Sequence, residues 1–274
     1  MLTLTRRRSL QAAVLVTLGA LLPRGARAAH DFGGFAMGLQ SFSLRHLGVD
    51  AALDAVRGFG LDYVELFGAH FSPESSPAEI GTMLKKLRTR DIAISAHGVN
   101  RFSADDAANR RIFEFANLAG IRNLAADPTP DNATFDSLEG LVEEFGVRIA
   151  IHNHGPGHHY DTPDKILAKI EGRHARLGAC ADLGHFIRAG VDPVAAIRAL
   201  EGRLYGVHLK DFDAPLGNAN GVVLGEGLLD LTAAFEALHA VAFPRDGALS
   251  LEYEEPDPEE DIRRCLEAAK RASS

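Results

Sequence analysis

Short apolar runs alternate with longer amphipathic segments along most of the chain. The short runs have the length of buried strands, and the longer segments have the length and periodicity of helices. Eight strands are predicted, at Phe35–Gln40, Tyr63–Leu66, Ile92–His97, Asn123–Ala125, Arg148–His152, Leu177–Asp182, Leu204–His208 and Ala248–Glu252. The predicted helices are Val49–Phe59, Pro77–Arg90, Ala104–Ala119, Phe135–Phe145, Pro163–Ile170, Pro193–Leu200, Leu231–Val241 and Pro258–Arg271.

Capping and turn residues mark the ends of several predicted helices. A capping residue stands directly before a proline at three helix starts, Ser76-Pro77, Thr162-Pro163 and Asp192-Pro193. Proline is well tolerated at the first helical position, because its missing N–H has no partner there in any case. Glycine follows four predicted helices, at Gly60, Gly120, Gly146 and Gly172, as is common where a helix ends.

Eight strand–helix pairs predict an α/β fold of the closed (β/α)₈ TIM barrel type. The chain has 274 residues, and such barrels need about 250. The alternative is an open, doubly wound sheet, which is expected to carry a glycine-rich phosphate turn after an early strand. No G-x-G-x-x-G follows the first predicted strand, and no linker divides the chain. We therefore expect one barrel domain over residues 29–274.

The first 28 residues have a different character from the rest. Arg6-Arg7-Arg8 precedes an uncharged run from Leu10 to Leu22, and Ala26-Arg27-Ala28 supplies the small residues that a signal peptidase prefers. This pattern predicts an export signal over residues 1–28, cleaved after Ala28, with the paired arginines of the twin-arginine class. An ordinary Sec signal is the alternative. The expected location is the periplasm, and a twin-arginine protein could load a metal before export.

Composition and charge narrow the classes of partner. The chain is 46% hydrophobic and 24% charged, which is ordinary for a globular protein. Its formal charge is −8, and loss of residues 1–28, with five arginines and no acid, makes this −13. Such a surface repels phosphate backbones, so no nucleic-acid partner is expected. Beyond the signal no segment could span a membrane. Cys180 and Cys265 are too few for a disulfide scaffold.

Four potential metal ligands stand at the ends of predicted strands five to eight: His152, Asp182, His208 and Glu252. A parallel barrel gathers the C-terminal ends of its strands around one mouth, so these side chains are expected to meet there. Two imidazoles and two carboxylates suit a divalent metal at about 2.0–2.3 Å. His154 has the same parity as His152 and is an alternative ligand or a close neighbour.

Further side chains at strand exits are candidates for substrate binding or catalysis. His185 follows strand six closely and could bind substrate or move a proton. Lys210 follows strand seven and could stabilise an oxyanion by its charge. Glu65, His97 and His154 are expected to contact substrate, although a salt bridge at the barrel rim is the alternative for Glu65.

Five segments carry a resemblance to a known family. They are Ile151-His152-Asn153-His154-Gly155, Asp182-Leu183-Gly184-His185, Val207-His208-Leu209-Lys210-Asp211, Leu224-Gly225-Glu226-Gly227 and Ser250-Leu251-Glu252-Tyr253-Glu254. Over residues 35–270 the chain resembles the xylose isomerase-like TIM barrel superfamily, in its sugar phosphate isomerase/epimerase branch. The resemblance implies a divalent metal, often Mn²⁺, with Zn²⁺, Co²⁺ or Mg²⁺ as alternatives. The implied ligand positions are His152, Asp182, His208 and Glu252.

One position departs from that family's pattern. Many of its epimerases and isomerases have glutamate where this chain has His152, and there two glutamates share proton transfer on opposite faces of the substrate. Only Glu252 of that pair remains, in an arrangement similar to the inosose dehydratase branch. The superfamily also includes apurinic endonucleases, but the negative charge and the export signal argue against a DNA substrate.

The predicted function is a metal-dependent isomerase or epimerase that acts on a small carbohydrate or keto-sugar through an enediolate. Glu252, His185 and Lys210 are the expected catalytic residues. A keto-glycoside lyase or dehydratase that uses the same metal site is one alternative, and a periplasmic sugar-binding protein without turnover is another. Sugar phosphates are not favoured, because no cluster of arginine and lysine residues offers a phosphate site.

Overall fold

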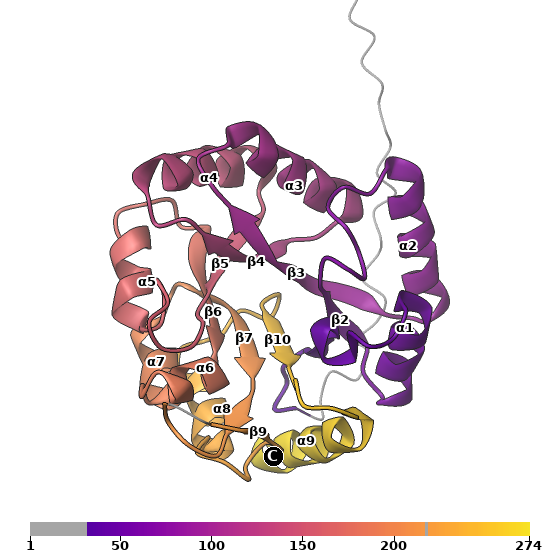
Figure 1. Cartoon of the computed structure of the whole chain (residues 1–274), viewed down its shortest axis with the longest axis vertical. Helices are drawn as coiled ribbons and strands as arrows, with labels where there is room; N and C mark the ends of the chain where they lie inside the picture. The colour runs from indigo at the N-terminus through magenta and orange to yellow at the C-terminus, as the bar shows by residue number, and fades with distance from the viewer. Residues whose placement is uncertain (1–31, 217–218) are drawn as a thin grey trace, which may run out of the picture.

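The computed structural model describes residues 32–216 and 219–274. Within them eight parallel strands close into a barrel in the order β1-β10-β7-β6-β5-β4-β3-β2, and helices surround it (Figure 1). The barrel strands are β1 (Met37–Gln40), β2 (Tyr63–Leu66), β3 (Ala93–Phe102), β4 (Asn123–Pro128), β5 (Arg148–His152), β6 (Leu177–Asp182), β7 (Leu204–Leu209) and β10 (Ala248–Leu251). The predicted TIM barrel is confirmed, whereas the predicted signal at residues 1–28 lies outside the described part.

The helices begin largely where the capping residues predict. They are α1 (Val49–Gly58), α2 (Pro77–Thr89), α3 (Asp106–Ala119), α4 (Asn132–Phe145), α5 (Pro163–Ile170), α6 (Leu183–Arg188), α7 (Pro193–Ala199), α8 (Leu231–Ala240) and α9 (Glu259–Ala272). Ser76, Thr162 and Asp192 each accept a backbone N–H in the first turn of their helix, as predicted. Helix α4 begins three residues earlier than expected, because Asp131 accepts the Thr134 N–H and caps it.

Several short elements were not predicted, and each follows the C-terminal end of a barrel strand. They are the 3₁₀ helix η1 (Ser41–Leu44), helix α6, and a hairpin of β8 (Asp211–Phe212) and β9 (Gly221–Val222). His185 therefore lies in a short helix that directly follows β6. Strand β10 ends at Leu251, so Glu252 follows the strand instead of ending it. These elements build up the rim of the barrel mouth.

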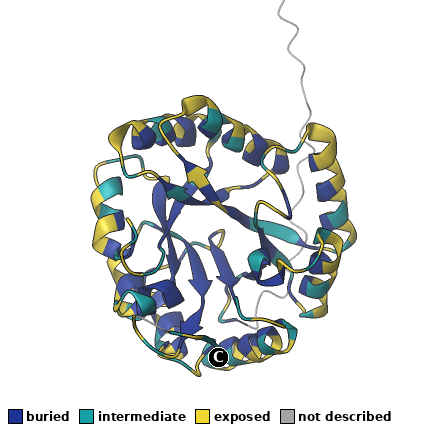
Figure 2. Cartoon of the chain, in the orientation of Figure 1, coloured by how far each residue is buried: buried dark blue, intermediate teal, exposed yellow. Residues whose placement is uncertain are grey.

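The apolar core lies between the strands and the inner faces of the helices. Figure 2 shows buried strands within a ring of helices whose outer faces are exposed. Helix α4 is typical, since Phe135, Leu138 and Val142 fall on one face and are all buried. Cys180 and Cys265 are buried and unpaired. Among the described residues, no helix has the length and apolar character needed to cross a bilayer.

Candidate metal centre at the barrel mouth

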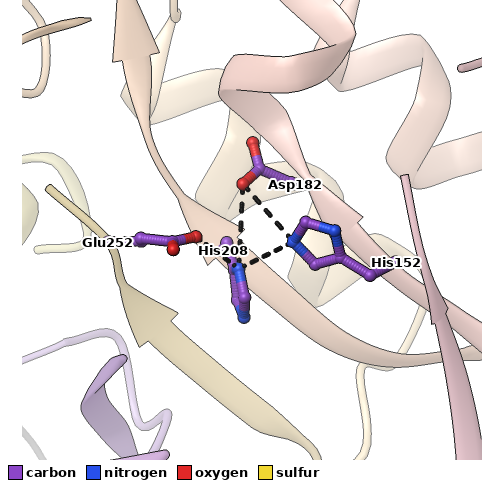
Figure 3. A group of neighbouring side chains, drawn as sticks. All are labelled: His152, Asp182, His208 and Glu252. Carbon is purple, nitrogen blue, oxygen red and sulfur yellow. Dashed lines mark hydrogen bonds and ion pairs between the residues drawn. The ribbon is translucent and has the colours of Figure 1, made fainter. Parts of the chain in front are cut away.

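Four neighbouring strand ends bring the predicted metal ligands together. His152 ends β5, Asp182 ends β6, His208 lies one residue before the end of β7, and Glu252 follows β10. Asp182 and His208 are paired in register across β6 and β7. All four are buried, and one potential ligand atom from each lies within 4.8 Å of the others. Figure 3 shows the side chains converging on a common point.

The distances within the cluster fit a single cation. His208 Nδ1 lies 2.8 Å from Glu252 Oε2 and 3.1 Å from His152 Nε2. Asp182 Oδ2 lies 3.6 Å from His152 Nε2 and 3.7 Å from His208 Nδ1. Bonds of about 2.1 Å place tetrahedral ligands about 3.4 Å apart. Asp182 Oδ2 is also buried without a hydrogen-bond partner, which a bound cation would supply. The donor set could therefore hold a divalent metal.

A buried carboxylate supports one of the proposed ligands from behind. Glu65 Oε2 lies 3.1 Å from His208 Nε2 and accepts a hydrogen bond of 2.7 Å from Ser250 Oγ. A carboxylate at the far nitrogen of a metal-binding histidine fixes the ring orientation and leaves the near nitrogen free for the metal. Glu65 is fully buried and does not line the cavity over the cluster. Glu65 thus forms an ion pair with His208 inside the barrel rather than at its rim, and its contact with substrate stays a prediction.

His97 is also deeper in the barrel than the sequence suggests. Its Nε2 lies 2.8 Å from the Phe71 carbonyl oxygen, and the ring packs edge-on against Phe71 and Phe115. Because the side chain is buried and does not line the cavity, its surroundings are those of a core residue. A substrate contact by His97 is thus not what this geometry favours.

Asn153 holds two of the strand ends together, a role that the sequence did not reveal. Strand β5 ends at His152, so the next side chain is free to turn toward β6. Asn153 accepts the Asp182 N–H at 2.7 Å and donates to the Asp182 carbonyl at 2.9 Å. These two hydrogen bonds fix the backbone of Asp182 directly beside the end of β5, where His152 lies. The only available signal was a polar residue placed between two histidines.

A cavity of about 320 Å³ opens over the cluster. It is lined by Gln40, Phe42, Phe67, Gly68, Gly98, Val99, His152, His154, His185, Glu252 and Glu254. His154 and His185, both predicted to contact substrate, line this cavity. The aromatic rings of Phe42 and Phe67 meet edge to face at 5.5 Å and add an apolar wall. These two rings, Gln40 and Glu254 were not predicted.

Lys210 is buried among three carboxylates beside the cluster and does not itself line the cavity. Its Nζ is 2.7 Å from Glu254 Oε1 and 3.6 Å from both Asp182 Oδ2 and Glu252 Oε2. Burial alone would raise the pKa of Glu252, but the charges of Lys210 and His208 outweigh it and lower that pKa to about 2. Glu252 is therefore an ionised carboxylate at neutral pH, next to a fixed ammonium group.

His154 and His185, two of the three histidines that line the cavity, are neutral near pH 7. Burial lowers the pKa of His185 to about 4, and burial together with neighbouring imidazoles lowers the pKa of His154 to about 3. Their rings are stacked with centroids 5.7 Å apart. A neutral imidazole has one nitrogen that accepts and one that donates, which suits binding of sugar hydroxyls.

The segment Leu224-Gly225-Glu226-Gly227, which is one of the five that carry the family resemblance, is held in place by the carboxylate of Asp211. Asp211 accepts hydrogen bonds of 2.9–3.0 Å from the backbone N–H groups of Phe212, Gly225, Gly227 and Leu229. These contacts hold the loop after β9 against the end of β7. A Cβ at Gly227 would meet the Asp211 carboxylate at 2.4 Å, so glycine is required there. Asp211 is therefore a loop anchor that keeps Lys210 beside the cluster.

The sequence model of the xylose isomerase-like TIM barrel family matches residues 53–272, which is most of the chain. The chain belongs to this family. The predicted resemblance is therefore confirmed at the level of the family. None of the curated proteins gives a match.

Solved structures with the same fold include enzymes and a zinc-binding protein. The probable 3-DHS dehydratase AsbF of Bacillus anthracis is 15% identical, with 85% of this chain and 98% of that one covered and a TM-score of 0.68. D-psicose 3-epimerase, solved in the presence of D-fructose, is 15% identical, with coverages of 87% and 96% and a TM-score of 0.65. The IolI protein with a bound zinc atom is 18% identical, with coverages of 87% and 95% and a TM-score of 0.62. Likeness at this identity shows the fold alone.

Proposed function

We propose that this protein is a divalent-metal-dependent enzyme that isomerises or epimerises a small sugar at the barrel mouth. The carrying observation is the convergence of His152, Asp182, His208 and Glu252 on one point beneath a cavity of sugar size. Membership of the xylose isomerase-like family supports this proposal, as do the names of the epimerase and dehydratase among its structural neighbours. Mn²⁺ is our proposed metal, with Zn²⁺, Co²⁺ and Mg²⁺ as alternatives.

A divalent metal bound here would supply Lewis acidity to the carbonyl and hydroxyl oxygens of a keto-sugar. Glu252 is ionised and lines the cavity, and so can accept the proton from the carbon beside the carbonyl. Lys210 presents a positive charge 3.6 Å from Glu252 Oε2, where it can stabilise the negative charge that develops on a substrate oxygen. The neutral ring of His185 can orient a hydroxyl or relay a proton.

A keto-glycoside lyase or dehydratase is the second candidate. His152 favours this candidate. Epimerisation with proton transfer on opposite faces of the substrate would depend on two glutamates, and this chain has a histidine in place of one of them. The same removal of a proton beside the carbonyl would then lead to the loss of a leaving group from the neighbouring carbon.

Proton exchange in D₂O tests the proposal and separates the candidates. The Mn²⁺-loaded protein is incubated with aldohexoses, ketohexoses and 3-keto-glycosides, and products are read by NMR. We expect deuterium at the carbon next to the carbonyl of a rearranged sugar, and a fall in exchange of about a hundredfold or more in Glu252→Gln. Glu144→Gln, an exposed change on α4, is the control.

Other outcomes of the same experiment have clear meanings. Release of an aglycone or of water would assign the protein to the lyase or dehydratase class. Sugar binding without exchange, with each of the four metals, would contradict an enzyme and favour a binding protein.

We also propose export to the periplasm, in which case the mature protein begins at Ala29.

A further inference from the structure

A second hollow lies at the barrel mouth, and the proposed reaction makes no use of it. Its volume is about 420 Å³, somewhat larger than that of the cavity over the cluster. Its polar lining comes from the exits of β3 and β4 and from the loop after β5, and consists of Arg101, Ser103, Asp127, Thr129, His158 and His159. None of these residues belongs to the cluster of His152, Asp182, His208 and Glu252, although Asp127 and His158 form with His154 a second group whose ligand atoms lie within 4.8 Å of one another.

The second hollow continues the walls of the first. On β3 the exposed residues Val99 and Arg101 alternate with buried neighbours, so their side chains share one face of the strand. Val99 lines the first cavity and Arg101 lines the second. On the opposite wall His154 lines the first and His158 the second, and their ring centroids are 4.5 Å apart. A ligand longer than one ring could therefore lie across both.

Partly exposed charged and polar groups equip the second hollow for hydroxyls. Asp127 Oδ1 lies 3.5 Å from His158 Nε2, and both side chains are about one-quarter exposed, at 23% and 26%. Arg101 is paired with Asp127 in register across β3 and β4. Its guanidinium is exposed and forms no ion pair with any residue of the described ranges. The carboxylate of Asp127 can accept hydrogen bonds and the guanidinium of Arg101 can donate them. This combination suits neighbouring sugar hydroxyls, each of which can both donate and accept.

We propose that this hollow binds a second sugar ring, so that the substrate is a disaccharide or similar glycoside. The reacting ring would lie over the metal cluster, an assignment that rests on the proposed function. Ligand sites commonly measure about 300–1,000 Å³, and each hollow alone is at the lower end of that range. A free monosaccharide over the metal cluster would leave the second hollow unfilled.

Equilibrium binding tests this inference without requiring turnover. Titration calorimetry of the Mn²⁺-loaded protein compares glucose with cellobiose, maltose, lactose, sucrose and trehalose. We expect at least one disaccharide to bind about tenfold or more tightly than glucose. Arg101→Ala and Asp127→Asn should reduce that advantage to about threefold or less, while the Kd for glucose stays the same. Arg122→Ala, an exposed arginine at the other end of β4, is the matched control and should preserve the advantage.

Disaccharides that bind no more tightly than glucose would overturn the inference. So would an Arg101→Ala variant that weakens both kinds of ligand equally, or one that leaves the disaccharide advantage intact. If deuterium exchange occurs with monosaccharides but the advantage is missing, the second ring site fails and the proposed enzyme stands. If the advantage is present but exchange is absent with every metal, the enzyme fails and the ring site stands.

Discussion

At the residue scale, Lys210 combines full burial with contacts to three carboxylates of the barrel mouth. Burial opposes its charge, but Glu252, Asp182 and Glu254 together raise the pKa of Lys210 above its ordinary value, so it remains an ammonium group. It is not among the candidate metal ligands. Under the proposed function, its positive charge acts from beside Glu252 Oε2 on a substrate oxygen that becomes negative during the reaction.

The variant Lys210→Met should lower kcat by about a hundredfold and leave the metal bound, because an electrostatic donor is lost while the ligands remain. Metal affinity measured by calorimetry should stay equal or rise, since a positive charge beside the cluster has been removed. Lys86→Met, on the outer surface of α2, is the control. Unchanged kcat in Lys210→Met, or loss of the metal, would contradict the assigned role.

Whether the position of a single side chain could be predicted from the sequence depended on how deep in the barrel that side chain lies. The sequence shows which residue ends a strand, and this was sufficient to bring His152, Asp182 and His208 together. It does not show how the strands are staggered along the barrel axis. Glu65 and His97 were therefore expected to contact substrate at the mouth, whereas Glu65 lies behind His208 and His97 packs among aromatic rings.

At the element scale, Asp211 ties the loop after β9 to the end of β7 through four backbone N–H groups. Asp211→Ala should lower the free energy of unfolding by about 3 kcal/mol, because buried amides lose their acceptor. Urea unfolding measures this, and hydrogen exchange at residues 225–229 should become faster. Asp213→Ala is the matched control, since within residues 32–216 and 219–274 the carboxylate of this exposed aspartate bonds to Asn220 alone, and its effect should stay within about 0.5 kcal/mol. Equal effects of the two variants would refute the anchoring role.

Long elements were predicted well and short ones were not. The barrel strands and the helices behind them carry periodic patterns and caps, as in α2, where Ser76 and Glu79 form a reciprocal capping box. Helix α6 and strands β8 and β9 are too short to show a period, and their positions depend on contacts at the rim. Strand β3 runs past its predicted end because Asn100 and Phe102 continue to pair with β4 beyond the irregularity after His97.

At the scale of the whole molecule, a closed parallel barrel collects the chemistry of distant segments on one face. The candidate metal cluster, the cavity above it and the second hollow all lie at the C-terminal ends of the barrel strands. The fold class follows from the eightfold alternation in the sequence, whereas the two adjoining hollows depend on loops whose course no pattern specifies. Export through residues 1–28 stays a prediction, as that segment is outside the described residues.

The central claim is that four strand ends form one metal site, and anomalous diffraction from crystals grown with Mn²⁺ tests it most directly. We expect a single strong peak at this face, within about 2.0–2.4 Å of His152 Nε2, Asp182 Oδ2, His208 Nδ1 and Glu252 Oε2. Asp182→Asn crystals should lose most of that peak. Mn²⁺ bound elsewhere, or no peak at these atoms in the wild-type protein, would contradict the account.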